Sequence, residues 1–472
     1  MTWSRACGAL LVLAFAGCPD RSISQLDSVP SAVTTKDIPV TADLDVLFVI
    51  DNSTSTHDKQ QAFADNFGRF VDALNAFPTG RPNLHLGVIT TSVDIGTDLN
   101  DPALTSAACH PLPGQDGLLQ NRASEPTNQC GQPTTDRYLS DVAVAGSDAR
   151  ATNYQGTLSD ALACIADVGT AGCGFESPLA AIRRALDGSH QPGNAGFLRK
   201  GAFLAVVILT DEDDCSTSSP SLFRQPPGAV GGNDLRCSTT AYDCDQAIAT
   251  GAPGMYTGCK VRRDGFLDDP ADYVRFLTGL KGSAGVAVAV IAGDAVPELA
   301  FGAIDQPFKQ PLALMPSCNT TIQGNYQIAR PALRLADFAS GFGALGLFRT
   351  ICQSDYRGAL ADIGALLFHA VSPCLDGAID PRDGATANPG LQPDCTVTDL
   401  DPDAPSDEPV GALLPACAMA SETVPDPAGA RPCWWVAPAD ECAATATGLA
   451  LHVERATLPA PNTRTRISCA AE

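Results

Sequence analysis

The sequence predicts an α/β fold built on a doubly wound parallel sheet. Four short apolar runs rich in β-branched residues are continuous rather than alternating in polarity, as is typical of strands buried on both faces of a sheet. Amphipathic helical patterns lie between these runs, and strands that alternate with helices indicate a parallel sheet of this kind. We expect this domain to span residues 43–373.

The expected elements follow one another in order along the chain. Strands are predicted at residues 44–50, 84–90, 203–209 and 285–291. Helices are marked by apolar side chains at helical spacing, namely Phe63, Phe67, Phe70, Val71 and Leu74, then Leu179, Ile182 and Leu186, then Tyr273, Phe276, Leu277 and Leu280, and finally Leu360, Ile363 and Leu367.

Two long segments interrupt the predicted domain, at residues 94–156 and 215–268. Loops of this length in a compact domain are usually either functional or held by cross-links. The first contains Cys109 and Cys130, and the second contains four cysteines. We therefore expect disulfides to staple both insertions, with a binding role as the weaker alternative.

The chain begins with the features of an export signal. Residues 1–17 combine Arg5 with an apolar stretch that is too short to span a membrane. Small residues directly before Cys18 resemble a bacterial lipobox, so Cys18 is expected to carry a lipid anchor, followed by a flexible tether over residues 18–42. The alternative is an ordinary cleaved signal, with Cys18 paired elsewhere.

Composition limits the compartment and the partners. The 472 residues include 18 cysteines, and loss of Cys7 with the signal and of Cys18 to lipid leaves an even number that can all pair. Such cysteine usage indicates an oxidising compartment, which here means the bacterial cell envelope, on the periplasmic side or the outer surface. The net charge of −23 argues against nucleic-acid binding, because a phosphate backbone requires a basic surface.

A second, smaller unit is expected at the C-terminus. Residues 374–472 contain six cysteines and read as a small disulfide-rich β module. Residues 448–455 alternate between apolar and polar side chains, and residues 463–469 are their expected hairpin partner.

Carboxylates and hydroxyls follow two of the predicted strands. Asp51 comes directly after the first strand, with Ser53 and Ser55 two and four residues later, and Asp211 follows the third strand. Ligands of open parallel sheets bind at the carboxyl ends of strands, beside a topological switch point, so these oxygens are expected to converge. Hard cations such as Mg²⁺ prefer oxygen ligands. The alternative is that Asp51 and the serines only cap the next helix.

The pattern Asp51-x-Ser53-x-Ser55 after a buried strand resembles the metal-ion-dependent adhesion site of von Willebrand factor type A domains. The resemblance covers roughly residues 41–372 and implies a Rossmann-like fold with Mg²⁺ at the top of the sheet, with Asp211 matching the later Asp of the family. More broadly, the chain is similar to predicted lipoproteins of myxobacteria and related bacteria that contain such a domain.

The sequence departs from the family pattern at two places. Asp211 is followed by Glu212 rather than Gly, and Glu176 stands where the family has a Thr. Glu176 would ligate the ion directly, shifting its preference towards Ca²⁺ or Mn²⁺, or accept from a metal-bound water, or simply favour the dipole of the next helix. A bridge between Cys164 and Cys173 would pin the loop that presents Glu176.

These patterns predict a binding protein rather than an enzyme. The metal would keep one coordination position open for a carboxylate of a protein ligand, and the lipid anchor would hold the chain on a membrane. Nucleophilic catalysis is disfavoured because Ser53 and His57 lack a third group that would orient them. Two alternatives remain, a structural or assembly lipoprotein whose metal only stabilises the fold, and a metal-assisted hydrolase.

Overall fold

The structure is a computed structural model. It describes residues 33–40, 43–77, 80–94, 115–121, 130, 136–144, 147, 149–219, 222, 233–248, 252–305, 307, 309–375, 379, 389–400, 411–443, 445–457, 459 and 463–470. The expected signal, Cys18 and Cys109 lie outside these residues. Among the described helices, none has the length and apolar character needed to cross a bilayer.

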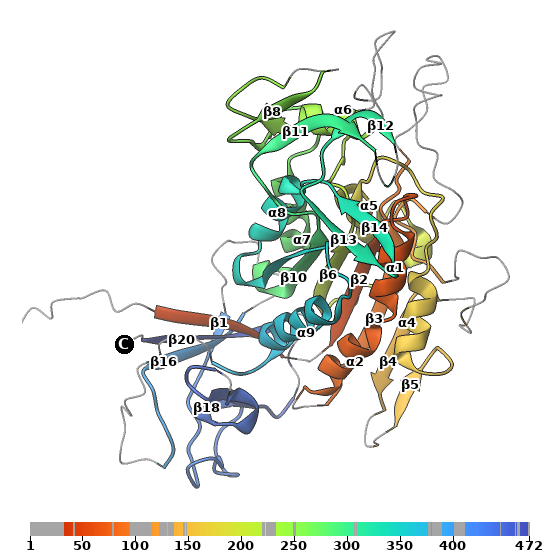
Figure 1. The fold of residues 1–472 in the computed structure, drawn as a ribbon. Coiled ribbons are helices and arrows are strands. Elements are labelled where there is room, and N and C mark those ends of the chain that lie inside the picture. Colours follow the sequence, from red (N-terminus) through yellow and green to blue (C-terminus); the bar gives the residue numbers. More distant parts are fainter. Residues whose placement is uncertain are drawn as a thin grey trace, which may run out of the picture.

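A seven-stranded sheet lies at the centre of the α/β unit (Figure 1). In spatial order it comprises β15 (Gly346–Thr350), β10 (Val286–Ala292), β6 (Phe203–Leu209), β2 (Leu44–Ile50), β3 (Leu84–Thr90), β4 (Leu139–Ala143) and β5 (Arg150–Thr152). The neighbours from β15 to β3 pair in parallel, whereas β4 and β5 pair antiparallel. The expected mixed α/β class with a parallel sheet is therefore confirmed.

Helices cover both faces of this sheet (Figure 1). One face packs against α1 (His57–Ala64), α2 (Phe67–Asn75), α4 (Leu158–Ala166) and α9 (Arg357–Val371). The other face packs against α5 (Pro178–Leu186), α7 (Pro270–Lys281) and α8 (Leu333–Ser340). Single turns of 3₁₀-helix occur at η1 (Pro192–Asn194), η3 (Ser283–Gly285), η4 (Gly343–Leu345) and η5 (Asp440–Cys442). The first apolar stripe is split between α1 and α2, and α4 and α8 were not predicted from the sequence.

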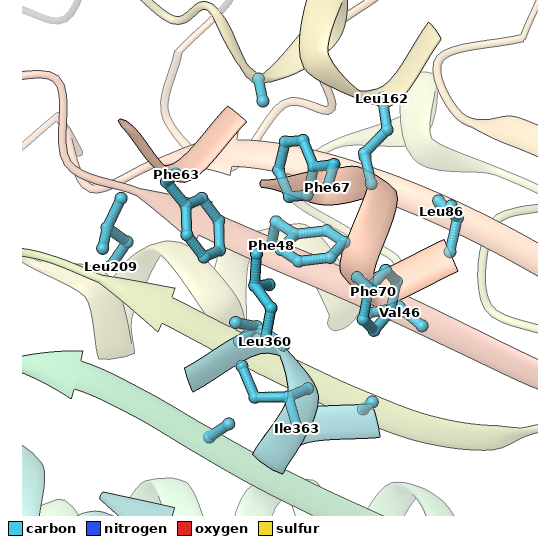
Figure 2. Packing of buried hydrophobic residues seen from close by; sticks show 14 of the residues in the cluster. Val46, Phe48, Phe63, Phe67, Phe70, Leu86, Leu162, Leu209, Leu360 and Ile363 are labelled. Carbon is cyan, nitrogen blue, oxygen red and sulfur yellow. The ribbon is translucent and has the colours of Figure 1, made fainter. Parts of the chain in front are cut away.

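The side chains of β2 explain why a continuous apolar run marks a central strand. All seven residues of β2 are buried, and alternate residues enter the clusters on opposite faces of the sheet. Phe48 packs edge-on against Phe63, Phe67 and Phe70, with ring centroids 6.2, 5.5 and 5.5 Å away (Figure 2). This aromatic group joins the central strand to α1 and α2.

The strand order places a topological switch point between β2 and β6. The chain runs from β2 to β3 on one side, and later returns to β6 on the other side of β2. Ile50 pairs with Leu209 in register, and the Asp51 amide donates to the Leu209 carbonyl at 2.9 Å. The segments that follow β2 and β6 therefore begin side by side.

The two expected insertions are organised differently. The segment 94–156 includes β4 and β5, which extend the sheet itself, so its later part is not an insertion outside the fold. The segment 215–268 carries α6 (Asn233–Ala241), β7 (Tyr242–Asp243), β8 (Gly254–Tyr256) and β9 (Lys260–Val261). As predicted, disulfides staple this segment, through Cys215–Cys237 and Cys244–Cys259.

A further segment between β10 and α8 was not predicted. It consists of β11 (Leu299–Ile304), β12 (Gln310–Leu314), β13 (Cys318–Ile322) and β14 (Asn325–Ala329). β13 and β14 form an antiparallel hairpin, and a disulfide from Cys318 to Cys352 ties its base to the segment after β15. Figure 1 shows the hairpin beside α1.

The C-terminal unit is a disulfide-held β structure, but two expectations about it were wrong. It contains β16 (Cys395–Leu400), β17 (Gly411–Leu414), β18 (Cys433–Pro438), β19 (Leu449–Glu454) and β20 (Arg464–Ala470). β19 pairs with β18 and not with β20, because alternation marks a strand without naming its partner. Within the expected tether, β1 (Val33–Pro39) pairs along its length with β20.

Three disulfides hold this unit together. They join Cys374 to Cys442, Cys395 to Cys469 and Cys417 to Cys433. Its small apolar core includes Val397, Trp434, Val436 and Ile467. A core of this size gains from cross-links, which restrict the unfolded chain.

The aromatic group around Phe48 gives a test of the fold. Replacement of Phe48 by Ala should lower the free energy of unfolding of the α/β unit by about 3–5 kcal/mol, because it leaves a cavity that three fixed rings cannot fill. Urea denaturation of the oxidised protein measures this loss. Phe266, whose side chain is 50% exposed, is the matched control, and Phe266→Ala should change the stability by no more than about 0.5 kcal/mol. Equal losses in both variants would contradict the packing described.

Candidate functional site

Asp51 lies at the centre of the site, directly after β2. It is fully buried, its Oδ1 accepts from the Ser53 amide at 2.8 Å, and its Oδ2 accepts from the Thr210 hydroxyl at 2.8 Å. Burial, and then the nearby Asp211 carboxylate, raise the pKa of Asp51 from 3.8 to about 7. The side chain is thus fixed in position but is held in an environment that disfavours its charge.

The predicted residues Ser53, Ser55 and Asp211 come together beside Asp51. The Ser53 and Ser55 hydroxyls lie 3.2 Å apart and share a hydrogen bond. Ser55 Oγ donates to Asp211 Oδ1 at 3.1 Å. The loop from β2 to α1 is closed by Thr56, whose hydroxyl donates to the carbonyls of Asp51 and Ser53 at 3.0 and 2.8 Å.

Glu176 approaches the same place from the loop before α5. Its side chain is only 1% exposed, and neither carboxylate oxygen has a hydrogen-bond partner among the described residues. Burial, followed by the charges of Asp51, Glu212 and Asp211, raises the pKa of Glu176 well above its usual range. A side-chain contact with the Glu212 carboxyl also raises this pKa, and it is a hydrogen bond only when one of the two carboxyls carries a proton.

The loop that presents Glu176 is fixed by contacts that the sequence pattern did not reveal. Asn52 accepts from the Gly172 amide through its carbonyl at 2.7 Å and from the Ser92 hydroxyl through its side chain at 2.8 Å. Ser92 Oγ in turn accepts from the Cys173 amide at 2.9 Å. A Cβ at Gly172 would lie 2.3 Å from Asn52 Oδ1, so the close approach requires glycine. These contacts set the course of the loop before Glu176.

The cysteines near this loop pair differently from the expected bridge. Cys164 is bonded to Cys130 rather than to Cys173, with Cα atoms 5.5 Å apart. Cys173 is itself disulfide-bonded. The bond from Cys164 therefore ties α4 to the first insertion. The loop carrying Glu176 is held by other contacts, including those of Asn52 and the Cys215 amide, which donates to the Glu176 carbonyl at 2.7 Å.

Lys59 is a member of the site that sequence reasoning missed. It lies on α1 and is 1% exposed, and its Nζ donates to Asp211 Oδ2 at 2.6 Å. It also donates to the Ser55 carbonyl and to Gln327 Oε1, both at 3.0 Å. The sequence places Lys59 four residues after Ser55, the spacing of one helical turn, and this was the only local indication that it belongs to the site. Its partners Asp211 and Gln327 are distant in sequence, so no local pattern identifies these contacts.

A cavity of about 200 Å³ lies beside these residues. Its lining includes Ser53, Ser55, Glu176, Asp211, Glu212 and Arg330. The side chains of the predicted residues present only carboxylate and hydroxyl oxygens as possible metal ligands. Mg²⁺ and Ca²⁺ prefer oxygen ligands of this type. Among the described residues, no three His, Cys, Asp or Glu side chains are placed to hold a metal ion by themselves, so a cation here would depend on the serine hydroxyls as well.

The isolated Glu176 carboxylate leads to a first prediction about the site. In metal-free buffer at pH 8, Glu176→Gln should raise the free energy of unfolding by about 1–3 kcal/mol, because it removes a buried carboxyl that must either carry an unfavourable charge or hold a proton that it would release in the unfolded chain. Folding raises the pKa of Glu176 in the wild type. The wild-type protein is therefore most stable, relative to Glu176→Gln, at low pH, and it loses this stability as the pH rises towards the folded-state pKa. The gain should therefore shrink towards pH 4.

Urea denaturation at several pH values, with EDTA present, measures this difference. Glu298 is exposed, and Glu298→Gln is the control that should show no such pH-dependent gain. A loss of stability in Glu176→Gln at pH 8 would show that the carboxylate is satisfied in the folded protein.

Comparison with known proteins gives no family assignment. No protein-family model matches the chain, and no curated protein matches it significantly. Among solved structures, it is similar to the pilus adhesin SpaC from Lactobacillus rhamnosus GG, at 11% identity over 93% of this chain and 40% of that chain, with a TM-score of 0.30. It is also similar to the human COPII-coat protein Sec24c, at 9% identity over 93% and 46% of the two chains, with a TM-score of 0.31.

A third similar structure is the adhesive tip pilin GBS104 from Group B Streptococcus agalactiae, at 10% identity over 94% of this chain and 83% of that chain, with a TM-score of 0.26. The chain spans less than half of the SpaC and Sec24c chains. At these TM-scores the similarities establish neither a shared fold nor a shared function, and the resemblance to von Willebrand factor type A domains stays a prediction.

Proposed function

We propose that this chain is a lipid-anchored cell-envelope protein that binds a divalent cation, most favourably Mg²⁺, and uses it to bind a carboxylate of a protein ligand. The ion would be held by Asp51, Ser53, Ser55 and Asp211. Glu176 would complete the site by accepting from a metal-bound water, because no three acidic side chains of the described residues are placed around one ion. The observation that carries the proposal is the Glu176 carboxylate, which is buried without a hydrogen-bond partner beside Asp51.

Charge supports this proposal. The carboxylates of Asp51, Glu176 and Asp211 are buried and near enough for their charges to interact, and Lys59 is bonded to Asp211. Burying ionised carboxylates without compensation is costly, so such a group either takes up protons or binds a cation. A divalent ion would compensate the excess charge and supply Glu176 with a partner.

Topology also supports the proposal. Asp51 and Asp211 follow β2 and β6, whose carboxyl ends meet at the switch point of the sheet, where open α/β sheets bind ligands. This order and the Asp51-x-Ser53-x-Ser55 loop favour a Rossmann-like fold of the von Willebrand factor type A kind. The cavity beside the site leaves room for a carboxylate to approach the ion.

The alternative is a structural role, in which the cation only neutralises the buried carboxylates. The same excess of buried negative charge favours this alternative, so the two roles differ in whether a partner binds. The disulfides of the described structure are compatible with an exported protein under either role.

Cation binding should depend on pH. At pH 8, Mg²⁺ at a hundredfold excess over its Kd should stabilise the protein by about 2–3 kcal/mol. The stabilisation should be much smaller at pH 5, because Asp51, with its pKa raised to about 7, must lose its proton before it binds a cation. Thermal melts with Mg²⁺, Mn²⁺ or Ca²⁺ at both pH values measure the effect. Asp51→Asn should abolish it, and an equal shift at both pH values would contradict the site.

Partner binding distinguishes adhesion from a structural role. The full chain, immobilised and mixed with envelope extract, should retain specific proteins in Mg²⁺ and release them in EDTA. Asp51→Asn should lose these proteins, whereas Asp362→Asn, a change at a half-exposed carboxylate on α9, should keep them. If the same proteins elute under all conditions, the adhesion role is wrong. Loss of thermal stability in EDTA without any cation-dependent partner would support the structural role.

A further inference from the structure

Lys59 places a positive charge inside the site proposed for the cation. Its ammonium has three N–H donors, and its three acceptors are Asp211 Oδ2, the Ser55 carbonyl and Gln327 Oε1. The side chains of Lys59 and Asp211 are 1% and 3% exposed. The ammonium is therefore held in one position and is fully hydrogen-bonded there.

The hairpin β13–β14 holds Lys59 in this position. Gln327 accepts from Lys59 and also donates through Nε2 to Asp58 Oδ2 at 2.8 Å. Asn325 donates to the same Asp58 oxygen at 2.9 Å. The disulfide from Cys318 fixes the base of the hairpin, so Gln327 is anchored at both ends of its strand.

Both oxygens of Asp211 are engaged in this arrangement. Ser55 donates to Oδ1, and Lys59 donates to Oδ2. A divalent cation that uses Asp211 must compete with these donors, and it is also repelled by the ammonium, because like charges interact strongly where water is excluded. Lys59 therefore opposes the binding of the ion that the other side chains favour.

We propose that Lys59 is an internal counter-cation that competes with the divalent ion for Asp211 and thereby sets the affinity of the site. This inference rests on the cation site proposed above. Without an ion, Lys59 neutralises Asp211; an ion displaces the ammonium from Asp211 and frees Gln327 of the hairpin. The site accordingly binds divalent ions more weakly than its oxygen ligands alone would allow.

The test compares the affinity of the full chain for Mn²⁺ and Mg²⁺ with that of two variants. By isothermal titration calorimetry at pH 8, Lys59→Met should bind both ions at least roughly tenfold more tightly than the wild type. Gln327→Leu keeps Lys59 but removes one of its acceptors, so it should increase the affinity by a smaller factor. This second variant keeps the proposal testable if Lys59→Met does not fold.

Lys281 supplies the matched control. It is also a buried lysine, but its Nζ donates to the carbonyl of Ala202, before the start of β6, at the opposite end of the sheet. Lys281→Met should leave both affinities within about twofold of the wild type. An equal gain in Lys281→Met would show that net charge alone acts, and would overturn the proposal.

The outcomes also separate this inference from the function on which it rests. If the wild type binds a divalent ion and Lys59→Met binds it no more tightly, Lys59 does not compete and the inference is wrong. If Lys59→Met binds and the wild type does not, the inference stands while the cation-dependent function of the wild type fails. If no variant binds, both fail.

Discussion

Negative charge is buried at the carboxyl ends of β2 and β6, and the residues around these strand ends must compensate it. Two parallel strands with apolar side chains on both faces can exclude water from the first residues that follow them. Asp51 and Asp211 occupy these positions, so their carboxylates depend on protein groups for compensation. Lys59 supplies that compensation for Asp211, whereas Glu176 has no corresponding cation bonded to it among the described residues.

The acidic run after β6 shows how differently neighbouring carboxylates are used. Asp213 accepts from the amides of Arg334 and Leu335 at 2.8 and 3.0 Å, so it caps the first turn of α8. Asp214 pairs with the buried Arg334 guanidinium at 2.9 Å. Both carboxylates therefore anchor α8 against the loop. Asp211 precedes these two residues on the same loop and lines the cavity. The contacts of Asp213 and Asp214 hold this loop in place.

The parts of the structure that could be predicted are those encoded locally. A buried parallel strand shows its full apolar run within seven residues, and Asp51, Ser53 and Ser55 lie on one short loop. The parts that could not be predicted depend on distant pairing. β1 needs the last strand of the chain as its partner, and Lys59 meets Gln327 across a sequence separation of 268 residues. No periodicity or local motif contains such information.

The segment between β10 and α8 forms part of the lining of the cavity. Ile328 and Ala329, at the end of β14, and Arg330, which follows it, line the cavity together with residues of the Asp51 loop. The loops after the strands supply the carboxylates and hydroxyls, and this segment supplies another part of the lining. Arg330 is one of these lining residues, and its guanidinium is held by donation from Nη2 to Gln310 at 2.8 Å. If the chain binds a ligand carboxylate as proposed, that carboxylate would enter beside Arg330, so the segment least evident from the sequence supplies part of the surface that the ligand would meet.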